Sequence, residues 1–66
     1  MQITVNGQSR EVAPATSIAT LLDELGLAER PVAVEVNLEL IPRGQHADHH
    51  LAEGDCLEIV TLVGGG

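Results

Sequence analysis

The 66-residue sequence has no phenylalanine, tyrosine or tryptophan, and it has a single cysteine, Cys56. One cysteine cannot form an internal disulfide, which excludes the disulfide framework of small secreted domains and favours a cytoplasmic protein. Without aromatic side chains, the core must be built from Val, Ile, Leu and Ala. The hydrophobic content of 44% is enough for such a core and too high for an intrinsically disordered chain.

Basic side chains are also scarce. Lysine is absent, the arginines are Arg10, Arg30 and Arg43, and ten acidic residues bring the formal net charge to −7. Because nucleic acids and anionic membranes are bound through cationic side chains, both are excluded as natural partners. A basic protein partner is favoured instead, since the long-range field of an acidic chain attracts it. No apolar run has the length of a membrane span.

The length of the chain limits what it can do alone. A chain of 66 residues makes one domain at most and buries only about 60% of the surface that its unfolded state exposes. Such a domain cannot house a deep pocket and a large cofactor beside its core. We therefore expect neither a self-sufficient enzyme nor a bound cofactor. The expected organisation is one domain over residues 1–63 and a flexible glycine tail over residues 64–66.

Residue patterning predicts strands at both ends of the chain and one helix between them. Residues 1–5 alternate apolar and polar, and Asn6-Gly7 is a strong signal for a hairpin turn into a second strand, residues 8–13. Ser17 can cap a helix that ends near Gly26. Its apolar stripe recurs at helical spacing, at Ile18, Leu21, Leu22 and Leu25. Further strands are expected over residues 32–36, 40–41 and 56–63.

This order of elements predicts an α+β fold, in which one helix packs across one face of a mixed sheet of four to five strands. The covered face of the sheet and the stripe of the helix then share one core. The residues expected in it are Ile3, Val5, Val12, Ile18, Leu21, Leu22, Leu25, Val34, Leu57 and Ile59.

The most informative feature is the ending Gly64-Gly65-Gly66 directly after the last strand. Three residues extend about 10 Å, and a thread without Cβ atoms can enter a channel too narrow for other residues. The functional interpretation is that the carboxylate of Gly66 is the reactive group, activated by a partner through acyl-adenylation from ATP. The alternative is a frayed, tolerant terminus.

The last strand carries apolar residues in both phases. Leu57 and Ile59 can face the helix, whereas Val60 and Leu62 lie in the opposite phase, where a solvated face would be polar. Beside the tail, these two residues suggest an exposed apolar patch for docking a partner. The alternative is a central strand that tolerates apolar residues on both faces.

Two further groups could carry chemistry. His46, His49 and His50 have a spacing that can ligate a metal on a helical turn, but the other ligands of a closed site are missing, so a solvated turn is favoured and no metal is expected. Cys56 is a lone thiol at the start of a strand. It could take part in sulfur transfer, although a structural role is favoured.

Several segments, in this order and at this length, match a known family. They are Met1–Gly7, the helix start Ser17-Ile18 with Leu21, Leu22 and Leu25, Val32–Asn37, Ile41–Arg43, Leu51–Asp55 and Glu58–Val60 leading to the glycines. The chain therefore resembles the ThiS family, the sulfur carrier proteins of thiamine biosynthesis, which implies a ubiquitin-like β-grasp fold. Gly65 and Gly66 match the diglycine end of the family, and Gly64 is an addition. Leu38 stands where the family commonly has glycine.

The resemblance implies a mechanism and its partners. An E1-like adenylyltransferase would use MgATP to adenylate the carboxylate of Gly66. Sulfur from the persulfide of a cysteine desulfurase would then displace AMP to form a thiocarboxylate, and thiazole synthase would take up the sulfur. The chain itself would be a carrier and not an enzyme. Two alternatives share the fold and the tail: the small subunit of molybdopterin synthase and a ubiquitin-type protein modifier.

Overall fold

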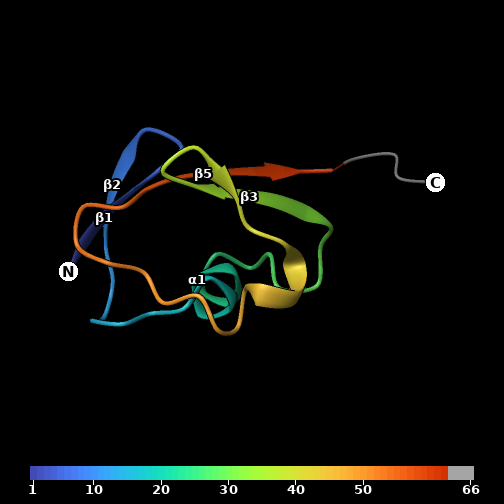
Figure 1. Cartoon of the computed structure of the whole chain (residues 1–66), viewed down its shortest axis with the longest axis horizontal. Coiled ribbons are helices and arrows are strands. Elements are labelled where there is room, and N and C mark those ends of the chain that lie inside the picture. The colour runs from blue at the N-terminus through green and yellow to red at the C-terminus, as the bar shows by residue number, and fades with distance from the viewer. Residues whose placement is uncertain (63–66) are drawn as a thin grey trace.

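The protein is described here by a computed structural model that defines residues 1–62, shown in Figure 1. Within this range, the helix and the strands follow the predicted order. The elements are β1 (Gln2–Val5), β2 (Gln8–Glu11), α1 (Ile18–Glu24), β3 (Val32–Val36), β4 (Glu39–Leu40), the 3-10 helix η1 (Arg43–Gln45) and β5 (Cys56–Thr61). The strands form one mixed sheet in the order β2-β1-β5-β3-β4. Helix α1 lies across one face of this sheet, which confirms the predicted α+β arrangement.

The first hairpin forms where the sequence predicts it. Asn6 and Gly7 have φ values of 51° and 82°, the left-handed pair that a two-residue turn needs to match the twist of its strands. Val5 then pairs with Gln8 in an antiparallel ladder. The strand predicted over residues 8–13 ends at Glu11, although Val12 still faces the core and is buried.

Helix α1 is fixed by the capping residues that the sequence predicts. The Ser17 hydroxyl accepts a hydrogen bond from the Thr20 amide at 3.1 Å, and Gly26 has a φ of 75° directly after the C-cap residue Leu25. Ile18, Leu21 and Leu22 are buried under the sheet. Because the helix has seven residues and no favourable charge in either end turn, packing of this face is what stabilises it.

The last strand, β5, is the centre of the sheet. It pairs in parallel with β1, where Val5 lies opposite Leu57, and antiparallel with β3, where Val34 lies opposite Ile59. The core contains eight of the ten residues expected from the sequence. Val5 and Leu25 are only half-buried, because each lies at the end of its element. Val36, Ile41 and Leu51 complete the core. Burial of Ile41 and Leu51 depends on how the segment after β4 folds back onto the helix, which periodicity does not encode.

A second hairpin joins β3 to β4. Asn37 and Leu38 have φ values of 52° and 72°, so these two residues make the whole turn and pairing resumes with Val36 opposite Glu39. The strand predicted at residues 40–41 therefore begins one residue earlier, at Glu39. Leu38 is a branched side chain in a region of φ that favours glycine, and it is 90% exposed.

Candidate functional site

The predicted site begins where β5 ends. Thr61 lies opposite Val32, the first residue of β3, and the Leu62 amide donates to the Pro31 carbonyl at 2.9 Å. These contacts attach the base of the tail to the sheet. The predicted attachment residue Gly66 and the threading residues Gly65 and Gly64 lie outside the described residues, so the predictions about them stay predictions.

The predicted docking residues lie on the open face of the sheet, away from α1. Val60 and Leu62 are 57% and 51% exposed, whereas Leu57 and Ile59, in the opposite phase of the strand, are 2% and 7% exposed. Leu40 is also exposed and lies opposite Glu35 on the same face. We call Leu40, Val60 and Leu62 the outer-face patch. Their exposure is as the sequence predicts, and docking at this patch remains a prediction.

The three histidines do not share one environment. His46 is buried, and its Nε2 lies 3.0 Å from the carbonyl oxygen of Ile41, whereas His49 is half-buried and His50 is exposed. The prediction of a solvated turn is therefore wrong for His46, because η1 folds this side chain against the end of β4. Among residues 1–62, no three His, Cys, Asp or Glu side chains lie together in a way that could hold a metal ion.

Cys56 is exposed at the start of β5, at the opposite end of this strand from the tail. Its neighbours are structural: the Cys56 amide donates to Asn37 Oδ1 at 3.0 Å, and its carbonyl accepts from the Asn37 amide at 2.7 Å. The thiol is accessible, but the described residues place it far from where the tail begins.

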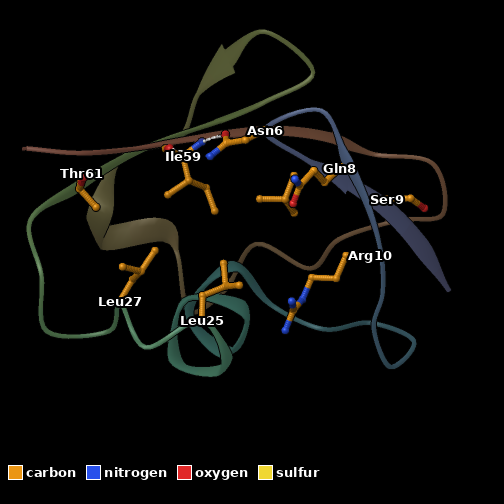
Figure 2. Close-up of a pocket in the computed structure, with 9 residues that line it drawn as sticks. Asn6, Gln8, Ser9, Arg10, Leu25, Leu27, Ile59 and Thr61 are labelled. Atoms are coloured by element: carbon orange, nitrogen blue, oxygen red, sulfur yellow. Dashed lines mark hydrogen bonds between the residues drawn. The ribbon is translucent and has the colours of Figure 1, made fainter.

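A recess of about 420 Å³ lies between the first hairpin, β5 and the end of α1 (Figure 2). Arg10 reaches into it from β2, and Leu25 and Leu27 line it from the helix side. The Asn6 side chain bonds to both backbone groups of Ile59, donating to the carbonyl at 3.1 Å and accepting from the amide at 2.8 Å. Asn6 thus replaces β1 as the partner of β5 after β1 has turned away, a role that sequence reasoning missed.

Arg10 is the charged residue that lines this recess. Its Nη2 lies 3.9 Å from Glu24 Oε1, and its buried Nε has no hydrogen-bond partner among residues 1–62. Within residues 1–62 no helix is long and apolar enough to cross a bilayer. Among the described residues, the end of β5 is thus bonded to the segment before β3, and the outer-face patch lies beside it.

The fold, together with the glycine ending of the sequence after the central strand, defines a small β-grasp protein of the carrier or modifier class. The sequence model of the ThiS family matches residues 3–66. Sulfur carrier protein ThiS of Escherichia coli is 30% identical over the full length of both chains. The crystal structure of a thiamine biosynthesis protein (ThiS) from Geobacter metallireducens superposes with a TM-score of 0.84, at 33% identity and over 100% of both chains. The chain belongs to the ThiS family.

A second kind of relative is much longer. A thiazole synthase of Paramagnetospirillum magneticum is 42% identical over the whole of this chain, and one of Magnetococcus marinus is 38% identical. The chain spans only 20% of the length of these two relatives. In both, a segment similar to this chain is part of the same polypeptide as a thiazole synthase.

Proposed function

We propose that this protein carries sulfur for thiazole formation in thiamine biosynthesis, as a thiocarboxylate on Gly66. An E1-like enzyme adenylates the Gly66 carboxylate with MgATP and releases pyrophosphate. The outer sulfur of a persulfide on a cysteine desulfurase then attacks the acyl-adenylate and displaces AMP, which gives an acyl disulfide between the two proteins. A thiol reductant cleaves this disulfide to the Gly66 thiocarboxylate and the free desulfurase thiol, and thiazole synthase takes the sulfur from the thiocarboxylate. The chain is a co-substrate of these partners in the cytoplasm and holds no cofactor of its own.

The observation that carries the proposal is the match to a sulfur carrier over the full length of both chains, glycine ending included. The structure adds a physical reason. A carboxylate is a poor electrophile, and residues 1–62 form no deep catalytic cleft, so the carboxylate must be presented to an enzyme that supplies ATP. A slim glycine ending suits that task, and the residue that begins the approach to it, Leu62, is bonded to Pro31.

Thiazole synthase is the partner best supported by the relatives. Two thiazole synthases contain a segment similar to this chain. Tethering a carrier to the enzyme that consumes its cargo raises the effective concentration of one for the other. This carrier is therefore expected to bind a thiazole synthase.

The test is the intact mass of the protein after incubation with MgATP, the activating enzyme, the desulfurase, cysteine and a thiol reductant. Replacement of one oxygen by sulfur at Gly66 is the expected result. Attachment of the chain to another protein would indicate a ubiquitin-type modifier instead, and an unchanged mass would refute both. Omitting ATP is the matched control, because no sulfur can displace an unactivated hydroxyl.

We further propose that the activating enzyme docks on the outer-face patch. Val60→Asp places a charge on this exposed apolar face and should slow adenylation at limiting carrier concentration, with little effect on folding because Val60 is 57% exposed. Ala13→Asp is the matched control, since Ala13 is exposed just beyond β2, at the opposite end of the sheet. Equal kinetics for the two variants would contradict docking at this patch.

A further inference from the structure

Two of the three arginines line one small recess on the helix side of the molecule. Arg30 and Arg43 border a space of about 190 Å³ together with His46, and no carboxylate lines it. The apolar walls come from α1 and from Val32 at the start of β3. Ten acidic residues and a net charge of −7 make this clustering of positive charge unusual for the chain.

Neither guanidinium is neutralised by a neighbour within residues 1–62. The ion pairs in this range are those of the N-terminus with Glu11 and of Arg10 with Glu24. Arg30 and Arg43 also make no side-chain hydrogen bond there, and both residues are exposed. Two planar groups of donors are therefore free to bind an anion from outside.

The position of the recess relates it to the tail. Val32 lies opposite Thr61, and Pro31, which follows Arg30, accepts the hydrogen bond from the Leu62 amide. In Figure 1, η1, which begins at Arg43, lies at the same end of the molecule as the end of β5. The end of β5 is thus flanked by the outer-face patch on one side of the sheet and by the recess of the two arginines on the other.

We propose that Arg30 and Arg43 bind a carboxylate side chain of thiazole synthase at the entrance through which the tail is received. This inference rests on the proposed function. A space of this size admits an Asp or Glu side chain but not a nucleotide. His46 supports the site by holding η1, and with it Arg43, against the end of β4 through its contact with the Ile41 carbonyl.

Such a contact would fix the orientation of docking. A carrier with a net charge of −7 is attracted to a basic surface as a whole, and that attraction alone does not specify which face docks. An acidic residue within a basic surface of thiazole synthase would be repelled by most of the surface of this acidic carrier. It would be attracted only at the Arg30–Arg43 recess. Docking then succeeds only when the tail points at the entrance.

The test measures the Kd of the full-length carrier for thiazole synthase by calorimetry, for Arg30→Gln, Arg43→Gln and Arg10→Gln. Each substitution removes one positive charge, taking the net charge from −7 to −7 − 1 = −8. Arg10→Gln is therefore the matched control for long-range attraction. We expect each of the other two to weaken binding about fivefold relative to this control, because each removes one charge-assisted contact.

The geometry gives a second, independent readout. Arg43→Lys keeps the charge and loses the planar fork, so it should restore binding only in part. Thermal unfolding of every variant verifies that the fold is intact. If Arg30→Gln and Arg43→Gln bind as Arg10→Gln does, the contact proposed here is refuted while the carrier function stands. If the wild-type chain does not bind thiazole synthase, the sulfur delivery step is refuted and this inference falls with it.

Discussion

Leu38 has a backbone conformation that is unfavourable for a residue with a side chain. Its φ of 72° is left-handed, a conformation that costs a residue with a Cβ about 1–2 kcal/mol. Its side chain recovers little of this cost, since it is 90% exposed. Leu38→Gly should therefore raise the free energy of unfolding by about 1 kcal/mol, which corresponds to a rise of about 4–8 °C in the melting temperature of so small a domain.

Leu38→Ala is the control for this prediction, because alanine removes the exposed side chain but keeps the Cβ. We expect its melting temperature to stay within the error of the wild type. Equal stabilisation by glycine and alanine would show that the exposed leucine, and not backbone strain, lowers the stability.

His46 is a structural histidine, contrary to what its sequence context suggests. It is buried and its Nε2 bonds to the Ile41 carbonyl. His46→Ala leaves that buried acceptor without a partner and should lower the free energy of unfolding by about 1–3 kcal/mol in urea titrations. His50→Ala removes an exposed histidine four residues away and should cost almost nothing. A similar loss for both variants would contradict the structural role of His46.

The histidines also show where sequence reasoning reached its limit. Their spacing of i, i+3 and i+4 suggests a shared face only if the segment is a regular helix. The segment instead forms one 3-10 turn and then an irregular stretch, so the three side chains separate. Exposure of Val60, by contrast, follows from the alternation of a single strand and was predictable. Local periodicity predicts which face a residue lies on, but not the path of a polar loop.

At the scale of elements, the two hairpins share one turn conformation, but the asparagine in each turn forms different side-chain hydrogen bonds. Asn6 and Asn37 have φ values of 51° and 52°, and each occupies the first position of a two-residue turn. The Asn6 side chain also bonds to both backbone groups of Ile59 in a partly buried setting. The bonds of Asn37, to Asp55 and Cys56, are exposed. Only the turns were predictable, because the partners of Asn6 lie 53 residues away.

This difference makes a matched pair of substitutions informative. Asn6→Ala and Asn37→Ala impose nearly the same backbone strain, so the difference between them reports the side-chain bonds alone. We expect Asn6→Ala to be more destabilising by about 1–2 kcal/mol, because it leaves partly buried groups of Ile59 unpaired. Urea denaturation of both variants measures the difference. Equal destabilisation would mean that the Asn6 bonds to Ile59 contribute no more to stability than the exposed bonds of Asn37.

At the scale of the whole molecule, the topology explains how the last described strand is held. The last strand, β5, lies at the centre of the sheet, between β1 and β3, so pairing on both sides fixes its direction. The sequence predicted the elements and the helix-covered face from local patterns. It did not predict the central place of β5 from those patterns, because parallel pairing of the first and last strands is a contact between the ends of the chain. A central position was only the alternative interpretation of the apolar residues on both faces of this strand.

The proposed function depends on the chemistry of the last residue and the width of the chain that leads to it. Amidating the carboxylate of Gly66 changes the shape of the protein very little but removes the group to be adenylated, so ATP–pyrophosphate exchange with the activating enzyme should be lost. Gly65→Val should also abolish exchange, for a different reason: a β-branched side chain cannot follow glycine through a narrow channel or into positive φ.

Binding distinguishes these two effects. The amidated chain should still compete with the wild-type protein for the activating enzyme, because its docking surface and its slim tail are intact. The Gly65→Val chain should compete more weakly, since its tail cannot enter. Glycine has no side chain to contribute to the core, so both variants are expected to melt at the temperature of the wild type. Pyrophosphate exchange that persists in the amidated protein would show that adenylation occurs elsewhere and would refute the terminal-carboxylate mechanism.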